Sequence, residues 1–137
     1  MSRFIFNHKD SNKYCLVSSS LKYANDPIGM LMNQDFIVIL VTAANRAEAE
    51  QIGQFLVEGK LAACCNIVDP IFSIFLWEGK TCQENEVLLI IKSVKNRFDA
   101  IVSEVKTLHS YDTPEIIALP IIAGSEEYLN WIKSETT

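Results

Sequence analysis

The chain has 137 residues, enough for one well-buried domain but too few for two ordinary ones. It is 49% hydrophobic and only 21% charged, with a net charge of −5 and no cluster of Lys and Arg, which excludes a broad phosphate-binding surface and hence nucleic acid as a partner. Its longest apolar runs, such as Phe36–Val41, are much shorter than the roughly 20 residues of a membrane-spanning helix, so we expect no membrane span.

Residues 1–34 differ from the rest of the chain. Their hydrophobic positions follow neither a helical nor a strand period for long, and Ser18–Ser20 and Asn25–Pro27 interrupt them. We expect residues 1–34 to form a loosely ordered N-terminal extension and residues 35–137 to form a single domain. The four cysteines have no CxxC spacing, which favours buried thiols in a reducing compartment and a cytoplasmic location. An organelle transit peptide in the extension is the alternative.

The first half of the domain predicts a strand, a helix and a long hairpin. Residues 36–43, FIVILVTA, are a β-branched apolar run typical of a strand. Asn45 and Glu48 form a capping-box pattern for a helix that Gly59 ends. Strands then follow at 61–68 and 71–77, with a bulge or bend at Asp69-Pro70. Residues 78–80 are a turn, and 84–92 form the return strand of the hairpin.

The second half predicts helix, strand and helix. Apolar residues recur every three or four positions from Phe98 to Leu108, which is the pattern of an amphipathic helix. Pro114 pushes the chain into an extended form, and 115–122 form a strand with Pro120 at a bulge or a sheet edge. A short final helix follows residues 124–125. The order β-α-β-β-α-β-α predicts an α+β, ferredoxin-like fold (a split βαβ) with a long hairpin and a C-terminal helix.

The strands are apolar on both faces, although the two main helices of this fold cover only one face. In Val87–Ile91 all five side chains are apolar, and Phe36–Val41 and Ile116–Leu119 behave in the same way. An uncovered sheet face of this kind is larger than the apolar patch that a monomer usually exposes. We therefore expect self-association, with folding of residues 1–34 over the same face as the alternative.

The sequence resembles the CutA family of small divalent-cation tolerance proteins. The resemblance rests on four segments and on the strand that runs from Glu86 to Lys92, which together span residues 36–134. The segments are GKLAACCNI (Gly59–Ile67), SIFLWEGK (Ser73–Lys80), HSYDTPEIIALPI (His109–Ile121) and YLNWI (Tyr128–Ile132). Membership implies a tight homotrimer of ferredoxin-like subunits, a role in tolerance of copper and other divalent metals, and no established catalytic activity.

The family resemblance also implies a metal site that this sequence keeps only in part. The family's proposed ligands are a cysteine late in the first strand and a pair of histidines before the tyrosine. These positions are Val41, Leu108 and His109 here, so only His109 is retained as a candidate metal ligand. Copper and zinc sites normally use three or four donors.

Three interpretations compete for the polar segment His109–Glu115. In the first it is structural, with His109 as a cation in the last turn of its helix and Tyr111 packed at a subunit boundary. In the second it lines a ligand pocket at the trimer interface. In the third His109 and Glu115 are the acid–base pair of a hydrolase, but no nucleophile accompanies them. The pocket residues of the second interpretation are Trp77, Glu86, Lys92, His109, Tyr111 and Glu115.

Two pocket residues have structural alternatives. For Trp77 the interpretation as a packing anchor is favoured over that as a ligand-stacking residue. Lys92 either extends its ammonium group to the surface or forms an ion pair with another subunit. The family resemblance therefore implies a non-enzymatic homotrimer that takes part in divalent-cation (copper) tolerance. Its partners are its own copies and a divalent cation such as Cu(II) or a small polar ligand, and no cofactor is obligatory. The alternative is a trimeric small-ligand sensor or interaction scaffold similar to the PII signalling proteins.

Overall fold

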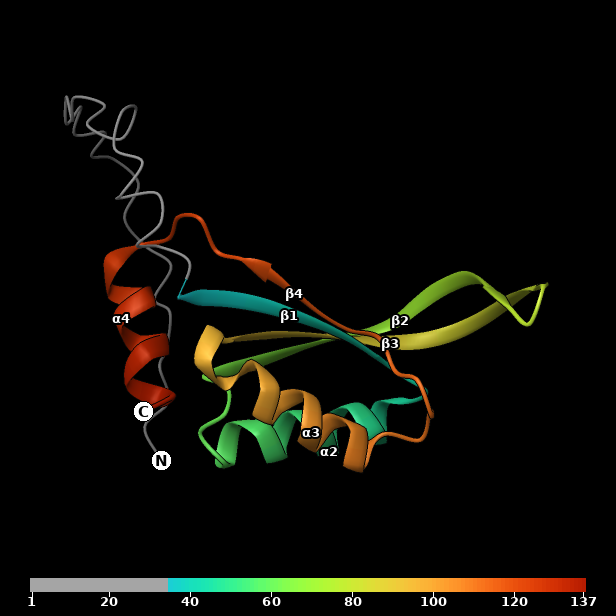
Figure 1. Cartoon of the computed structure of the whole chain (residues 1–137), viewed down its shortest axis with the longest axis horizontal. Coiled ribbons are helices and arrows are strands. Elements are labelled where there is room, and N and C mark those ends of the chain that lie inside the picture. Colours follow the sequence, from blue (N-terminus) through green and yellow to red (C-terminus); the bar gives the residue numbers. More distant parts are fainter. Residues whose placement is uncertain (1–34) are drawn as a thin grey trace, which may run out of the picture.

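A computed structural model describes residues 35–137 as one antiparallel sheet with helices on it (Figure 1). The elements are β1 (Phe36–Ala43), α2 (Arg46–Glu58), β2 (Cys64–Trp77), β3 (Lys80–Val94), the 3-10 turn η1 (Lys95–Arg97), α3 (Phe98–Leu108), β4 (Ile116–Pro120) and α4 (Glu126–Glu135). The strand order is β2-β3-β1-β4, and α2 and α3 cover one face. The predicted ferredoxin-like fold is confirmed. The prediction for residues 1–34 lies outside the described residues.

Helix α2 begins and ends at the residues that its sequence indicates. The Asn45 side chain accepts the amide N–H of Glu48 at 3.0 Å, and the Glu48 carboxylate accepts the amide N–H of Ala44 at 2.9 Å. These two bonds satisfy amide groups that the first turn leaves without helical partners. At the other end the amide of Gly59 donates to the Phe55 carbonyl at 3.0 Å. The capping-box prediction is therefore confirmed, except that the Glu48 carboxylate accepts the amide N–H of Ala44 and not that of Asn45.

The hairpin of β2 and β3 is longer than the sequence predicts. Glu78 and Gly79 both have positive φ, 48° and 76°, and form the two-residue turn whose twist matches that of paired strands. Lys80 therefore pairs with Trp77, and β3 begins four residues before the predicted Glu84. The register shifts between Val68 and Ile71, which confirms the bulge at Asp69-Pro70.

Strand β2 begins three residues later than predicted, and its two adjacent cysteines point to opposite faces. The amides of Leu61 and Ala62 turn back to the Leu56 carbonyl, at 2.9 and 3.1 Å, which keeps both residues out of the sheet. The Cys65 thiol packs on α2, where a Cβ on Gly53 would approach its sulfur to 3.0 Å. Burial raises the pKa of the Cys65 thiol to about 11, against the opposing charge of Lys92.

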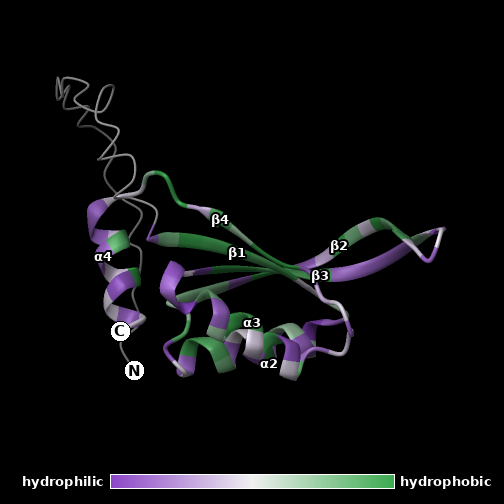
Figure 2. Cartoon of the chain, in the orientation of Figure 1, coloured by the Kyte–Doolittle hydropathy of each residue, from purple (hydrophilic) through white to green (hydrophobic). Residues whose placement is uncertain are grey.

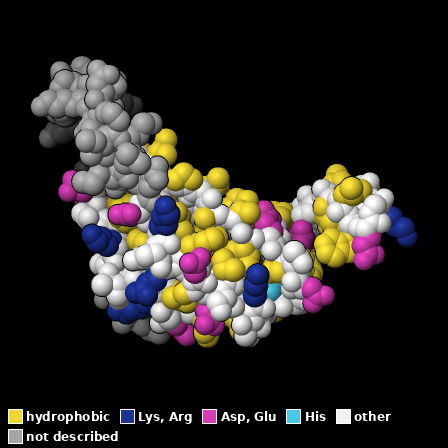
Figure 3. Space-filling model, viewed as in Figure 1, with side chains coloured by type: hydrophobic (Ala, Val, Ile, Leu, Met, Phe, Trp, Pro, Cys, Tyr) yellow, Lys and Arg dark blue, Asp and Glu magenta, His cyan; other side chains and the backbone are white. Residues whose placement is uncertain are grey.

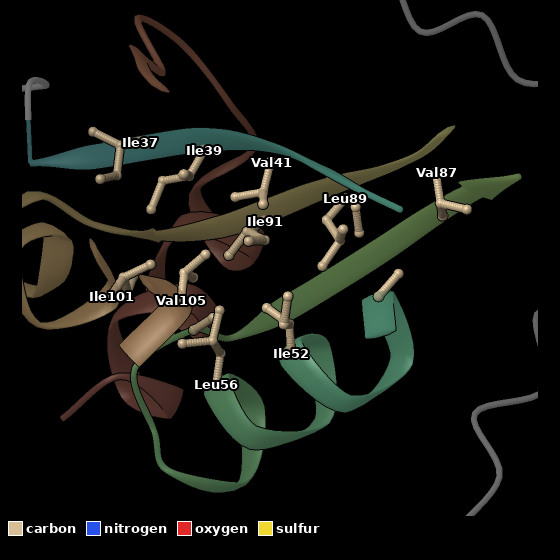
Figure 4. Close-up of a cluster of buried hydrophobic side chains, with 13 residues drawn as sticks. Ile37, Ile39, Val41, Ile52, Leu56, Val87, Leu89, Ile91, Ile101 and Val105 are labelled. Atoms are coloured by element: carbon tan, nitrogen blue, oxygen red, sulfur yellow. The ribbon is translucent and has the colours of Figure 1, made fainter. Parts of the chain in front are cut away.

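The hydrophobic core lies between the sheet and its two covering helices (Figure 4). Alternate residues of β1 and β3 point down onto α2 and α3, and Figure 4 shows Ile52 and Leu56 meeting them from α2. Period-two strands facing 3.6-period helices account for the burial pattern. The strand residues of this core are Ile37, Ile39, Val41, Ala43, Val87, Leu89 and Ile91, and those of α3 are Ile101 and Val105.

The opposite sheet face and the hairpin carry exposed apolar side chains. Figure 2 shows hydrophobic residues along β1, β4 and part of β2, and Figure 3 shows hydrophobic side chains at the surface of the body and of the hairpin. On the hairpin Phe72, Ile74 and Leu76 are 63–71% exposed. On the outer strand β4, Ile117 and Leu119 are 47% and 50% exposed. Since β1 pairs Leu40 with Ile117 and Val38 with Leu119, these β4 side chains extend the face opposite the helices. The predicted two-sided apolar sheet is present in residues 35–137.

Helix α4 packs at one end of the sheet. Its Ile132 is fully buried, and the Arg97 side chain donates from Nε to the Thr136 carbonyl at 3.0 Å, which ties the end of the helix to η1. Burial raises the pKa of Tyr128, and the adjacent Cys64 raises it further, so the first turn of α4 lies beside the start of β2. Neither α4 nor another helix in residues 35–137 is long and apolar enough to cross a membrane.

Candidate functional site

A cavity of about 820 Å³ lies where the hairpin leaves the body of the molecule. One wall comes from the hairpin and the other from the segment between α3 and β4. Four of the six predicted pocket residues line it, namely Trp77, Glu86, Tyr111 and Glu115. The remaining lining residues are Thr42, Ser73, Ile74, Phe75, Cys82, Glu84, Ser110, Asp112 and Thr113.

The cavity is acidic. Glu84, Glu86, Asp112 and Glu115 contribute carboxyl groups, and no Lys, Arg or His of residues 35–137 lines it. Acidic side chains surround the base of the hairpin on the visible face (Figure 3). Burial raises the pKa of the Tyr111 hydroxyl, and the charge of Glu86 and the hydrogen bond that Tyr111 donates to it raise it further. The cavity therefore favours positively charged ligands over anions.

Strand alternation explains the hairpin wall of the cavity. Cys82, Glu84 and Glu86 are two residues apart on β3, so their side chains point to the same side. Cys82 pairs with Phe75 and Glu84 with Ser73 on β2, which adds the neighbouring wall residues. The sequence interpretation missed Cys82 because it began the return strand at residue 84, and it missed Glu84 although this residue lay within the predicted strand. The period-two pattern that contains Glu86 was the available signal.

His109 lies behind the rim of the cavity and does not line it. It follows the last residue of α3 in an extended conformation, with φ −81° and ψ 142°. Its Nε2 lies 2.7 Å from the Thr42 carbonyl, and its Nδ1 accepts the amide N–H of Tyr111 at 3.0 Å. The imidazole thus bonds to backbone groups through both nitrogens. His109 is the C-cap residue of α3, one position beyond the helical turn in which the sequence interpretation placed it.

The same hydrogen bonds bear on His109 as a metal ligand. Both ring nitrogens are bound to backbone groups, so a metal ion could bind His109 only by displacing one of them. Within residues 35–137 no group of three or more His, Cys, Asp and Glu side chains is placed to hold a metal ion. In this arrangement His109 positions the loop that carries Tyr111 into the cavity.

Glu48 is the second residue that holds this loop. Besides the Ala44 amide, its carboxylate accepts the amide N–H of Ser110 at 2.5 Å, and it lies 3.9 Å from Nδ1 of His109. Burial alone would raise the pKa of Glu48, but the hydrogen bonds from Ala44 and Ser110 and the proximity of His109 bring it below the ordinary 4.5. The start of α2 and the cavity rim are therefore joined through one carboxylate.

We expect the stabilisation by Glu48 to depend on pH. A carboxyl group whose pKa is lower in the folded protein stabilises it above the unfolded pKa, and this contribution disappears as the pH falls through the folded value. Glu48→Gln should therefore lower the Tm at pH 7, and the difference from the natural chain should shrink below about pH 4.5. Thermal unfolding at a series of pH values measures this. A difference in Tm that stays constant from pH 7 down to about pH 3 would contradict this expectation.

Lys92 lies away from the cavity in a single chain. It is six residues beyond Glu86 on β3, about 20 Å along the strand. Lys92 is only 8% exposed, and its ammonium group donates to the Asn66 side chain and to the Ile90 carbonyl at 3.1 Å. The interpretation of Lys92 as a lysine that reaches the surface is wrong. The predicted ion pair with another subunit stays a prediction.

Comparison with known proteins places the chain in a family. The family model described as CutA1 divalent ion tolerance protein matches residues 37–135. The chain belongs to this family. The CutA1 match runs from the second residue of β1 through α4 and contains every residue that lines the cavity. The resemblance found in the sequence is confirmed.

Individual CutA relatives show how much of each protein is shared. The chain is 45% identical over 100 residues to a chloroplastic CutA protein of Arabidopsis thaliana, covering 73% of this chain but only 55% of that relative. It is 42% identical to the divalent-cation tolerance protein CutA of Thermus thermophilus, covering 72% of this chain and 96% of the relative. The solved structure of the periplasmic CutA of Archaeoglobus fulgidus has a TM-score of 0.73 at 44% identity, with 74% of this chain and 99% of that one covered.

Proposed function

We propose that the protein is a homotrimer that takes part in divalent-cation tolerance without catalysing a reaction. The observation that carries the trimer is the exposed apolar surface of the hairpin, together with the apolar sheet face that α2 and α3 leave uncovered. Full burial of a Phe, Ile or Leu side chain contributes roughly 1.5–3 kcal/mol relative to exposure. Phe72, Ile74 and Leu76 alone therefore favour association by several kcal/mol, because each is more than half exposed in the single chain.

The free sheet edges support a closed ring of copies. Within residues 35–137, β2 and β4 are the two edges of the sheet, and β2 from Ile71 to Trp77 pairs only with β3. An unpaired edge presents amide and carbonyl groups to a strand of another molecule. Contact between the different edges β2 and β4 of successive copies is head-to-tail, and such contacts close into a ring when the rotation permits. We propose three copies, as the family resemblance implies.

The assignment to cation tolerance rests on the CutA1 family match, whose description and relatives carry that name. Copper is the ion that we propose. Since one chain brings no three donor groups together in residues 35–137, donors from more than one subunit would have to complete the site. The absence of catalysis is supported by the cavity lining, where the Cys82 thiol has no basic side chain to activate it.

A small-ligand sensor, similar to the PII signalling proteins, is the second candidate. The cavity favours it, because 820 Å³ lined by aromatic, hydroxyl and carboxyl groups is the size and composition of a ligand pocket. It lies beside the exposed hairpin, and pockets often form where subunits meet. In this case cation tolerance would be an indirect result of ligand binding.

Calorimetric titration of the full chain separates the two candidates. We expect Cu(II) to bind with micromolar affinity and Mg²⁺ not to bind at the same concentrations. No heat from Cu(II) or Zn(II), together with binding of a small organic ligand, would replace the first candidate with the second. Incubation with ester and acyl phosphate substrates should give no turnover, and measurable turnover would contradict the non-enzymatic role.

We also propose a cytoplasmic location. The free thiols Cys64, Cys65 and Cys82 support a reducing compartment, since such thiols are maintained there without pairing. The Arabidopsis relative is named as chloroplastic and the Archaeoglobus structure as periplasmic, so relatives occupy several compartments. Fractionation of cells that express the full chain tests the proposal, and recovery in an organelle fraction would contradict it.

A further inference from the structure

We propose that the cavity at the base of the hairpin binds an organic cation with two or more amino groups, such as a diamine or polyamine. This inference rests on the second candidate function, in which the cavity is a ligand site. It specifies the chemical class of the ligand from the lining of the cavity. Nothing in it depends on a metal ion.

The charge of the lining points to a cation with more than one positive group. Four carboxyl groups from both walls face a single space, and no basic lining residue neutralises them. Glu84 and Glu86 come from β3, while Asp112 and Glu115 come from the segment before β4. A ligand with ammonium groups at both ends can donate hydrogen bonds to both walls at once, and such charge-assisted bonds are stronger than neutral ones.

Aromatic side chains stand among these carboxyl groups. Phe75, Trp77 and Tyr111 line the cavity. Ammonium groups are attracted to the faces of aromatic rings, most strongly to tryptophan. The methylene groups of a polyamine also pack on such rings. A wall that alternates aromatic and acidic side chains therefore suits an alkyl amine better than a bare inorganic ion.

Glu86 is the most deeply placed acidic group of the cavity. It is only 7% exposed, and the Tyr111 hydroxyl donates to it, so its orientation is fixed from the opposite wall. Burial of a carboxylate is unfavourable unless cationic or hydrogen-bonding groups compensate it. None of the ion pairs within residues 35–137 includes Glu86. A bound ligand would therefore supply the compensating positive charge.

The same geometry disfavours the other small-ligand classes. Phosphates and nucleotides carry negative charge, which the four carboxyl groups repel. A first-row metal ion needs several donors within a few ångströms of one point, and residues 35–137 contain no such group of three. An extended organic cation can form hydrogen bonds at several points along its length, so it does not need several protein groups close to one point.

The test is calorimetric titration of the full chain with spermidine, 1,4-diaminobutane and n-butylamine at low ionic strength. We expect the diamine to bind at least about tenfold more tightly than the monoamine of the same length, because only the diamine spans both walls. Raising the salt concentration should weaken binding, since exposed charges are screened. ATP should not bind.

Two substitutions at exposed positions locate the site. Glu84→Gln and Trp77→Leu should each weaken spermidine binding by about tenfold, through the lost charge and the lost ring. Glu127→Gln, an equal change on an exposed residue of α4 outside the cavity, should leave it unchanged. The mass of each variant in solution, measured beside the natural chain, verifies that assembly is intact.

Three results would overturn the inference. These are no spermidine binding at about 1 mM by the intact assembly, equal affinity of diamine and monoamine, or full affinity in both cavity variants. Any of them, with the expected mass and Cu(II) binding preserved, would remove the amine site but leave the proposed role in cation tolerance. Loss of Cu(II) binding with amine binding retained would remove the proposed role in cation tolerance but leave the amine site.

Discussion

Leu119→Lys is expected to dissociate the trimer. Leu119 is half exposed in the single chain and extends the apolar face opposite the helices, on the free edge strand β4. Association would bury the introduced ammonium group among apolar side chains without a partner, which costs several kcal/mol at each interface. We expect the dissociation constant to rise at least about a thousandfold, equivalent to about 4 kcal/mol. Sedimentation equilibrium over a range of protein concentrations measures the shift.

A matched substitution on the helical side serves as the control. Val57 on α2 is 39% exposed, close to the exposure of Leu119, but it lies on the surface that is not proposed to associate. Val57→Lys should therefore leave the trimer intact. Dissociation by both variants would indicate general destabilisation, and a stable trimer of Leu119→Lys would show that β4 is not part of the interface.

His109→Ala is expected to lower the Tm by at least about 10 °C, from a loss of about 3 kcal/mol. The substitution leaves the Thr42 carbonyl and the Tyr111 amide without their side-chain partner and opens a cavity in a fully buried position. These groups hold the end of β1 against the loop that enters the cavity. Differential scanning calorimetry at pH 7 measures the change.

Two milder substitutions separate the hydrogen bonds of His109 from its bulk. Asparagine offers an oxygen near the position of Nδ1, so His109→Asn can keep the bond from Tyr111, whereas His109→Gln can keep a donor toward Thr42. The Tm of each variant should lie between that of the natural chain and that of His109→Ala. Thr107→Ala, an exposed neighbour on α3, is the control and should change the Tm by only a few degrees. A Tm of His109→Ala equal to this control would contradict the positioning role.

The elements with strong local signals were predicted to the residue. β1 is a continuous β-branched run, α2 has a capping residue and a terminal glycine, and α3 has an unbroken apolar stripe. Each signal is contained in a short window of sequence, so tertiary structure has little to override. The fold class followed from the order of these elements.

The start of β3 was missed because its first residues carry no apolar alternation. Lys80–Gln83 are held in the strand by their pairing with β2 and by the tight turn at Glu78 and Gly79. Pairing partners and turn geometry are tertiary properties that polar residues do not indicate by themselves. The error left Cys82 outside the predicted strand and hence outside the predicted site.

Four of the six predicted pocket residues line one cavity, and the other two lie outside it for a similar reason. Residue type and neighbourhood in sequence identified Trp77, Glu86, Tyr111 and Glu115, which the fold brings to one cavity. His109 has a partner 67 residues away, the Thr42 carbonyl, and that contact decides its role. Such distant backbone contacts of a single histidine cannot be inferred from a local motif.

Sedimentation or light-scattering measurement of the mass of the natural chain tests the central proposal most directly. The account predicts a particle of three times the 15.4 kDa chain, unchanged on dilution into the low micromolar range. A folded, soluble particle with the mass of one chain across the same dilution series would contradict it, because the apolar face of the sheet would then meet water without a partner.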